Sequence, residues 1–347
     1  MPDEKPQTHS DLGNSQAGTP AASIVILSYN SASYLGPCLH SVARLAPPPA
    51  EVIVVDNASR DDSVKVAQNV AAELGLEICT IPLAGNLGCA GGNNVGWRAT
   101  RGDIVIFLNP DTEVSPSFVG EVAAAFATDE RIGIVGAKIY YPNSNRLQHA
   151  GAIIHPNGQT DHFGAGETDN GQFDEPRECD YVTGAGFAVR RQVLTELGGF
   201  DEDFYPAYFE EVDFCTRARK RGWRVLYWPR ATMVHHESVS LGVASERFLR
   251  LYHRMRMRYC AKHFTWKQWV REFLPRERVA WRLGSAIDRR AMRAASAVVN
   301  RPCISIMICT SGPTASRTAA TISTARRRSG AGISTAAAPK GSILSAR

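Results

Sequence analysis

The sequence predicts a doubly wound α/β fold, in which helices cover both faces of a mostly parallel sheet. Three apolar runs, each ending in polar residues, support this prediction: residues 23–30, 51–59 and 103–111. The runs are continuous in Val, Ile and Leu rather than alternating, which is typical of strands buried on both faces. Helix-compatible segments lie between them, at residues 34–45, 61–74 and 90–100. This alternation of strand and helix predicts a parallel sheet.

The second half of the chain is less regular. Residues 141–178 are rich in Gly, Asn, Asp and His and have weak periodicity, which predicts an insertion of loops and hairpins over the site. Residues 182–191 predict a short strand that enters a helix, and residues 223–229 predict another strand. From residue 246 to 281, aromatic and aliphatic side chains are interleaved with Arg and Lys at helical spacing. We therefore expect a basic helical appendage at the C-terminal side of the fold.

Composition places the chain among ordinary globular proteins. Hydrophobic residues make up 44% and charged residues 21% of 347 residues. The sequence contains no run of eighteen or more apolar residues, so no transmembrane helix is expected. The polar N-terminal segment lacks the apolar core of a secretory signal. The eight cysteines form no C-x-x-C pair, so free thiols in the cytoplasm are expected. The predicted division is a disordered leader (1–22), an α/β domain (23–243), a basic amphipathic helical region (244–302) and a low-complexity, disordered tail (303–347).

Charge is distributed unevenly along the chain. Residues 1–243 hold 18 Lys and Arg against 30 Asp and Glu, whereas residues 244–302 hold 15 against 4. An acidic domain that binds an anionic nucleotide would need a cation between the two. The basic region has two interpretations: helices that pack on the sheet, or a surface that lies on anionic lipid. Nucleic acid is not an expected partner, because no RNP, helix-turn-helix or zinc signature accompanies the basic residues.

Polar side chains follow three strands of the predicted sheet: Tyr29, Asn30, Asp56, Asn57, Asn109 and Asp111. Ligands of such sheets bind beyond the carboxyl ends of the strands. Asp56 can accept a hydrogen bond from a base or ribose, or it can cap the next helix. Asn109 and Asp111 point to one side of an extended segment and can hold Mg²⁺ or Mn²⁺, although Asn-Pro-Asp-Thr is also good turn chemistry.

A glycine- and asparagine-rich segment, NLGCAGGNNVGW, covers residues 86–97. Glycines allow the backbone to approach a phosphate or a sugar, and a helix that begins near Ala90 would direct its N-terminus at an anion. The segment matches neither a Walker loop nor G-x-G-x-x-G. A plain glycine-rich turn is the alternative.

An acidic cluster follows about a hundred residues after Asp111. On a helix, Glu210 and Asp213 share a face, and crowded acids raise one another's pKa, which suits a general base. The alternative is an acidic first turn that the helix dipole favours. His235 and His236 come after a predicted strand and can bind a metal or a phosphate, or simply lie in solvent.

Taken in order, these segments resemble family 2 glycosyltransferases, in particular the rhamnosyltransferase-like branch that builds bacterial cell-surface polysaccharide. The resemblance rests on SIVILSYN, EVIVVDNAS, NLGCAGGNNVG, LNPDTEV, TGAGFAVRR, FYPAYFEEVDFCTRARKRGW and HH, and it covers residues 23–241. It implies a GT-A fold, a nucleotide-diphosphate-sugar donor, a divalent metal (Mg²⁺ or Mn²⁺) and inversion at the anomeric carbon.

The resemblance also implies a role for each matching position. The nucleoside pocket matches Tyr29, Asn30 and Asp56, and the donor-sugar segment matches Asn86, Gly88, Gly91 and Asn93. Asp111 matches the metal-binding acid of the D-x-D motif, whose first acid is replaced by Asn109. The second acid of the family's E-D motif is the general base, which makes Glu211 the first candidate, followed by Asp213 and Glu210. The late contact to metal or diphosphate matches His235 or His236.

The main hypothesis is therefore an inverting, metal-dependent glycosyltransferase that acts on a glycan or lipid-linked acceptor. It would be cytoplasmic and peripheral on the inner face of the plasma membrane. A non-catalytic nucleotide-sugar binder or scaffold is the alternative, because Asn109 and Glu211 depart from the acids of the motifs. A sugar nucleotidylyltransferase is also possible in principle, but its usual glycine-rich loop with a cation is missing from SYNSASYLG.

Overall fold

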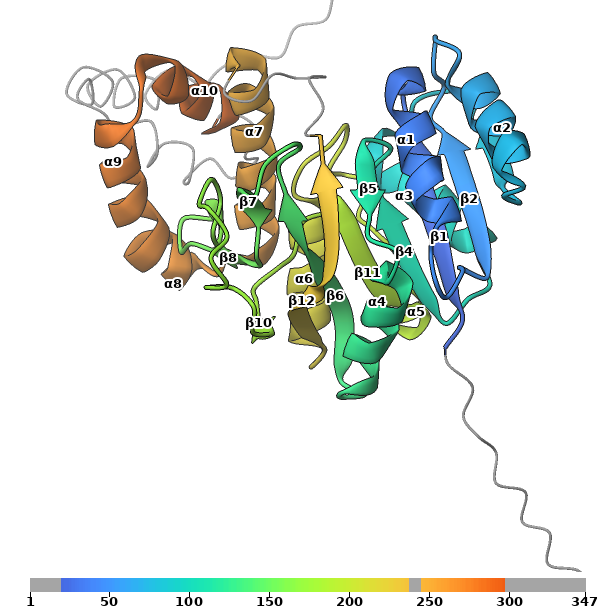
Figure 1. Cartoon of the computed structure of the whole chain (residues 1–347). Coiled ribbons are helices and arrows are strands. Elements are labelled where there is room, and N and C mark those ends of the chain that lie inside the picture. Colours follow the sequence, from blue (N-terminus) through green and yellow to red (C-terminus); the bar gives the residue numbers. More distant parts are fainter. Residues whose placement is uncertain (1–19, 237–244, 297–347) are drawn as a thin grey trace, which may run out of the picture.

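The computed structural model describes residues 20–236 and 245–296, which form a large sheet with helices on both faces (Figure 1). The strand order is β10-β12-β6-β11-β4-β1-β2-β3. The parallel half contains the three predicted strands and a fourth: β1 (Ala22–Ser28), β2 (Glu51–Asp56), β3 (Cys79–Pro82) and β4 (Ile104–Leu108). β1 begins at the last residue of the predicted leader. Residues 1–19 of that leader and the predicted tail lie outside the described residues.

The three predicted helices of this half are confirmed: α1 (Ala32–Ala43), α2 (Ser63–Leu74) and α3 (Gly88–Ala99). The glycines of α3 have a packing function. A Cβ at Gly92 would collide with Leu27, and one at Gly96 would collide with Val25. The helix therefore lies unusually close to β1, and part of the glycine signal reflects this contact rather than a ligand.

The other half of the sheet is mixed. β11 (Gly186–Arg190) runs antiparallel to both β4 and β6 (Ile132–Tyr140), and β12 (Arg224–His235) runs parallel to β6. β11 enters α5 (Arg191–Leu197), as the sequence predicted. The apolar pattern did not single out β6 or α4 (Phe118–Ala127), although both are buried.

The predicted insertion is confirmed as loops and short strands. Its strands are β7 (Leu147–His149), β8 (Ala152–Ile154), β9 (Thr160–His162) and β10 (Arg177–Glu178). β8 and β9 form a separate hairpin, whereas β7 adds to the edge of β6. The insertion is thereby tied to the strand that neighbours β12.

Two apolar cores lie on the two faces of the sheet. One packs α1, α2 and α4 against the sheet, and the other packs α3, α5 and α6 (Glu210–Lys220). Neighbouring residues of β1 alternate between them, with Ile24 and Ile26 in the first core and Val25 in the second. The alternation explains why this strand is apolar at every position.

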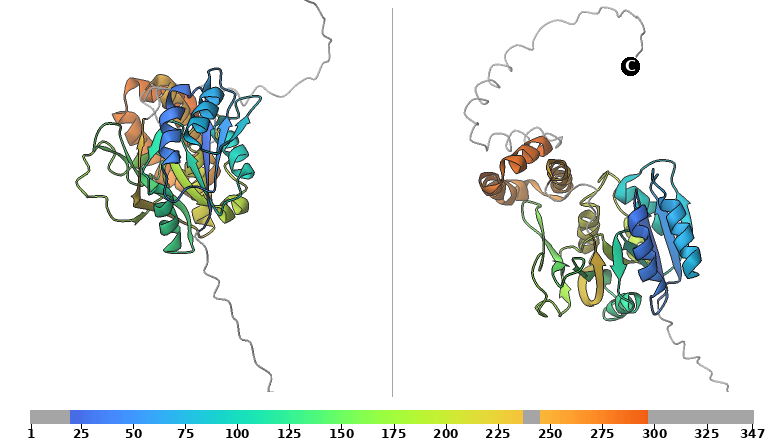
Figure 2. Two further views of the ribbon diagram at one scale, coloured as in Figure 1. Left: turned by 45° about the vertical axis from the view of Figure 1, so that its right-hand side comes forward. Right: turned by 45° about the horizontal axis from the view of Figure 1, so that its top comes forward.

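The basic region is helical, as predicted, and comprises α7 (Glu246–His263), α8 (Trp266–Gln268), a π-helical turn (Trp269–Phe273), α9 (Leu274–Leu283) and α10 (Ala286–Ser296). Figure 1 and the right view of Figure 2 show these helices gathered at the end of the sheet away from α1 and α2. Their inner face belongs to the second core, through Met255, Tyr259 and Phe273 among others. The interpretation that these helices pack on the sheet domain is therefore correct for their inner face.

A buried ion pair joins these helices to one another. Arg256 on α7 donates two hydrogen bonds to Glu277 on α9, at 2.8 and 2.7 Å, and a third, at 3.1 Å, to the carbonyl oxygen of Asn157 in the insertion. Across residues 20–236 and 245–296, no helix has both the length and the apolar character needed to cross a membrane.

Candidate functional site

The ends of β1 and β2 form one hydrogen-bonded unit. Asp56 is buried and accepts hydrogen bonds from the backbone N of Ser59 at 3.0 Å and from its Oγ at 2.5 Å. The backbone N of Asn30 donates to Ser59 Oγ at 2.9 Å, and Arg60 N donates to Asn30 Oδ1 at 2.8 Å. Asp56 does not cap α2, because that helix begins seven residues later, after Asp62. Tyr29 lies beside this unit with 45% of its surface exposed, so its ring is accessible to a ligand.

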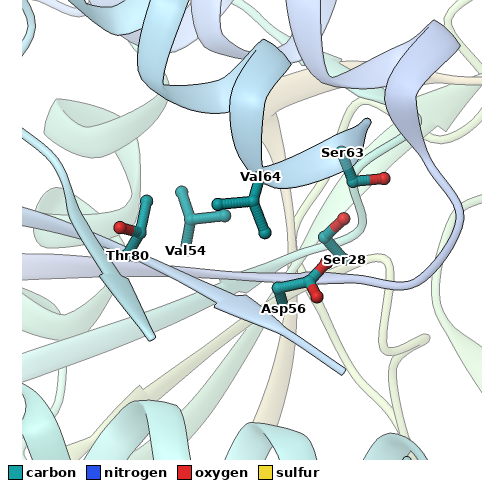
Figure 3. A pocket seen from close by; sticks show the side chains of 6 residues that line it. All are labelled: Ser28, Val54, Asp56, Ser63, Val64 and Thr80. Carbon is teal, nitrogen blue, oxygen red and sulfur yellow. The ribbon is translucent and has the colours of Figure 1, made fainter. Parts of the chain in front are cut away.

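A small recess lies behind Asp56, between the strands and α2 (Figure 3). It is lined by Ser28, Val54, Asp56, Ser63, Val64 and Thr80, and it has no room for even a water-sized molecule. Pockets for small molecules usually have about 300–1,000 Å³. The recess is therefore too small for a nucleotide.

Asn57 connects the end of β2 to residues 86–88, at the start of α3. It is buried; its Oδ1 accepts from Leu87 N at 2.8 Å, and its Nδ2 donates to Asn86 Oδ1 at 3.2 Å and to Gly88 O at 3.1 Å. Asn86 Oδ1 also accepts from Gly88 N at 2.8 Å. Asn57 is one of the polar residues that the sequence places at the end of a buried strand, but its contacts with residues 86–88 could not be read from the sequence.

The N-terminus of α3 abuts the segment that leads into α6. Gly88 has φ +74°, and a Cβ there would lie 2.8 Å from Pro206 O. The backbone N of Cys89 donates to the same oxygen at 2.8 Å. Gly91 is packed against Leu87, and Asn93 is half-buried in the same helix. The buried amide of the segment is instead Asn94, which bonds the backbone of Phe200 and the side chain of Glu202.

Glu210 and Glu211 begin α6, next to this helix terminus. Burial raises the pKa of Glu210 well above its usual value, and the charge of Glu211 raises it further. Burial also raises the pKa of Glu211, to about 7. The Cys89 thiol hydrogen-bonds Glu210, while Glu210 Oε2 is buried with no hydrogen-bond partner in the described part of the chain. Both carboxyl groups therefore hold their protons to higher pH than a free glutamate, and Glu211 is poised to gain or lose a proton near neutral pH.

Asp213 has a different environment from the one expected. It is fully buried and accepts from Arg217 Nε at 2.6 Å, His263 Nε2 at 2.7 Å and Lys262 Nζ at 2.6 Å. Burial acts to raise its pKa, but the hydrogen bond from His263 and the charges of Arg217 and Lys262 lower the pKa to about 2. The expectation that Asp213 and Glu210 raise each other's pKa is therefore wrong. A carboxylate that accepts hydrogen bonds from an arginine, a lysine and a histidine is a poor proton acceptor, and Asp213 instead clamps α6 to α7.

The end of β12 approaches the acid at the end of β4. β12 pairs antiparallel with β5 (Thr112–Val114), which places His235 opposite Thr112. His235 Nε2 lies 3.3 Å from Asp111 Oδ1 and 3.4 Å from Asn109 Nδ2. His236 is turned away, and its Nε2 lies 2.8 Å from Glu113 Oε1. Of the two candidate histidines, the structure therefore brings His235 to Asp111.

This arrangement fits a divalent cation that is held by few protein ligands. Asp111 offers a carboxylate and His235 an imidazole, a combination suited to Mn²⁺ and acceptable to Mg²⁺. Within residues 20–236 and 245–296, no set of three or more His, Cys, Asp or Glu side chains could enclose a metal. Such a cation would need further oxygen ligands from a diphosphate and from water.

Comparison with known proteins identifies the family and the fold of the chain. The model of the family described as "Glycosyl transferase family 2" matches residues 23–198, which is half of the chain. A solved mannosyltransferase, PcManGT from Pyrobaculum calidifontis in complex with GDP-Man and Mn²⁺, superposes with a TM-score of 0.53 at 18% identity, over 89% of this chain and 80% of that one. The likeness confirms the expected GT-A fold.

Two relatives differ in how much of their length the chain spans. The uncharacterized protein y4gI of Sinorhizobium fredii is 31% identical over 65% of this chain, but only 25% of that protein is covered. The N-acetylglucosaminyl-diphospho-decaprenol L-rhamnosyltransferase of Mycobacterium tuberculosis (strain H37Rv) is 26% identical over 70% of this chain and 85% of its own length. The chain is thus similar to a short segment of the first and to most of the second.

Proposed function

The chain belongs to glycosyl transferase family 2, and from this premise we propose that it moves a sugar from a nucleotide-diphosphate donor to a hydroxyl group of a glycan or lipid-linked acceptor, with inversion. The observation that carries the proposal is the convergence of His235 and Asp111 at the end of β4, and a second set of groups, Glu210 and Glu211, lies against Cys89 at the start of α3. Asp111 and His235 are suited to a cation on the donor's diphosphate, and Glu211 is suited to the acceptor's proton. A scaffold that only binds nucleotide sugars has no use for a carboxyl group with a pKa near 7.

The proposed mechanism assigns one task to each set. Glu211 accepts the proton of the acceptor hydroxyl as its oxygen attacks the anomeric carbon, on the face opposite the leaving diphosphate. Glu210 keeps its proton beside Glu211, so the pair does not carry two charges. A divalent cation, held by Asp111 and His235, would supply positive charge that neutralises the diphosphate. The N-terminus of α3 adds a fixed dipole on the same side. Inversion requires one base and no protein nucleophile.

We propose a rhamnosyl group as the transferred sugar and cell-surface polysaccharide as the product, because the mycobacterial relative is named for a rhamnosyl transfer to a lipid-linked acceptor. Calorimetry with a panel of nucleotide-diphosphate sugars should show that a rhamnosyl donor binds more tightly with Mn²⁺ than with EDTA. Asp111→Asn is expected to weaken this binding by about tenfold or more, because it removes the only carboxylate at that strand end. Failure of every donor to bind would reject the proposal, and binding without turnover would favour the scaffold.

The outer face of the C-terminal helices is suited to an anionic membrane surface, and we propose that it brings the enzyme to lipid-linked acceptors on the inner face of the plasma membrane. Its exposed apolar side chains include Trp266, Val270, Val279 and Ile287. Exposed basic side chains surround them: Lys267, Arg271, Arg278, Arg282 and Arg290. An amphipathic aromatic residue among cations is typical of a helix that rests at the lipid interface.

Flotation with liposomes tests this surface. The protein should float with vesicles that contain about a third anionic lipid and remain behind with neutral vesicles. Each Lys or Arg near an anionic surface contributes about 1 kcal/mol, so the double variant Lys267→Glu/Arg271→Glu should bind at least about tenfold more weakly. Lys65→Glu, an exposed site on α2 at the other end of the sheet, is the matched control and should bind like the wild type. Flotation that does not depend on anionic lipid would contradict the proposal.

A further inference from the structure

We propose that Gln148 is a positioning residue that fixes the tautomer of His235, so that the bare Nε2 of the imidazole faces Asp111. Gln148 comes from β7 in the insertion, 87 residues before His235, and its Oε1 lies 2.7 Å from His235 Nδ1. The purpose of this arrangement, holding a divalent cation, rests on the proposed function. The tautomer itself does not.

In the structure the amide of Gln148 presents its carbonyl oxygen to His235 Nδ1. A carbonyl oxygen can only accept, so His235 Nδ1 carries the proton and donates it to Gln148 Oε1. A neutral imidazole has one N–H, which leaves Nε2 with a lone pair. On that side Nε2 meets Asp111 Oδ1 at 3.3 Å and the amide nitrogen Asn109 Nδ2 at 3.4 Å. An imidazole lone pair and a carboxylate oxygen thus converge on one point, as a cation requires.

The opposite tautomer, with the proton on Nε2, would leave no lone pair facing Asp111. With the proton on Nε2, His235 would donate directly to Asp111, and the carboxylate would be occupied by an internal hydrogen bond. Gln148 disfavours that state, because its carbonyl oxygen would then face a second acceptor at 2.7 Å. Partners that hold the far nitrogen of a metal-binding histidine act in this way, and their loss typically weakens metal binding by about 10- to 100-fold.

The insertion holds Gln148 firmly in place. Gln148 is buried, and its neighbour His149 pairs with Ile139 of β6. The ring of His162, on β9, hydrogen-bonds the main chain of Gln148 and packs edge-on against His149 with ring centroids 4.6 Å apart. The segment that seemed to be only a cover over the site thus contributes a fixed acceptor to it.

The adjacent histidine provides a control within the same structure. His236 has its own acceptor, Glu113, at 2.8 Å, and this pair does not include Gln148. Removing Glu113 therefore disturbs a histidine contact one residue away without changing the partner of His235. Gln148→Glu is the conservative variant, because a carboxylate also accepts from Nδ1–H and should keep the tautomer.

Two measurements on the full-length protein test the inference. Long-range ¹H–¹⁵N spectra of histidine-labelled protein without metal should show His235 with its proton on Nδ1 in the wild type and in Gln148→Glu, and on Nε2 or on both nitrogens in Gln148→Ala. Titration of Mn²⁺ alone, followed by electron paramagnetic resonance, should show binding about 10- to 100-fold weaker in Gln148→Ala. Gln148→Glu and Glu113→Ala should bind Mn²⁺ like the wild type or more tightly.

The outcomes separate the inference from the function on which it rests. A wild-type His235 protonated on Nε2, or a Gln148→Ala protein with the wild-type tautomer and Mn²⁺ affinity, would overturn the inference. If His235→Ala leaves Mn²⁺ binding unchanged while the tautomer still depends on Gln148, the metal site of the proposed function fails, and so does the stated purpose of Gln148. Gln148→Glu guards against a folding defect, since it keeps a side chain of the same length.

Discussion

Replacement of Glu211 by Gln is expected to lower kcat for sugar transfer by about 10²- to 10⁴-fold, with the Kd of the donor changed little. Gln keeps the shape of the side chain but cannot accept a proton, and burial raises the pKa of Glu211 to about 7, which suits a base at neutral pH. Single-turnover rates and donor calorimetry would be measured on the same preparations.

Glu210→Gln is the matched control for this variant. Burial and the charge of Glu211 raise the pKa of Glu210, which favours its protonated form, and an amide resembles that form, so we expect a much smaller loss of kcat. A large loss in Glu210→Gln together with an active Glu211→Gln would move the role of base from Glu211 to Glu210.

The pKa of Glu211 also predicts a dependence on pH. Transfer should rise with pH and level off above about pH 7, as Glu211 loses its proton. A carboxyl group whose folded pKa is raised stabilises the fold below its unfolded pKa, and this contribution is lost as the pH rises through about 7. Glu211→Gln should therefore unfold at higher denaturant than the wild type at pH 8 and at a similar concentration at pH 4. Equal stability at both pH values would contradict the raised pKa.

The second large effect is expected from Asp213→Asn, which should destabilise the fold by about 3–5 kcal/mol. The variant leaves Arg217, Lys262 and His263 around a neutral side chain, and breaking one partner of a buried ion network leaves uncompensated charge. Urea denaturation at pH 7 measures the loss directly.

Asp203→Asn is the control, since Asp203 pairs with Arg258 at 3.0 Å but is exposed to solvent. An exposed ion pair contributes at most about 1 kcal/mol, so this variant should be nearly as stable as the wild type.

The folded pKa of Asp213 is depressed, so its contribution to stability is present above its unfolded pKa and is lost as the pH falls through about 2. Equal losses in the two variants would mean that the clamp between α6 and α7 does not stabilise the fold.

Three strands of the parallel half, β1, β2 and β4, could be predicted because they are buried and continuous in apolar residues, whereas β3 at the edge, with the sequence CTIP, is partly exposed and was not predicted. The same pattern failed for β6, where Gly133 and Gly136 interrupt the apolar run. Gly136 is required there because a Cβ would collide with Val182. Close packing between elements distant in sequence thus removed the local signal.

Part of the candidate site could also be predicted from the sequence, and part depends on contacts between distant segments. The polar strand ends could be read from the sequence, but the choice between His235 and His236 could not, because it depends on the pairing of β12 with β5. The environment of Asp213 depends on Lys262 and His263, about fifty residues away on a helix outside the matched family segment. Helical spacing within α6 could not reveal these partners.

The most direct test of the central claim is the anomeric configuration of the transferred sugar, measured by NMR from the one-bond C–H coupling of the product made by purified protein with Mn²⁺. A single displacement with Glu211 as base predicts a product inverted relative to the donor, formed by the wild type and not by Glu211→Gln. A product that retains the donor's configuration, or equal product formation by Glu211→Gln, would contradict the account.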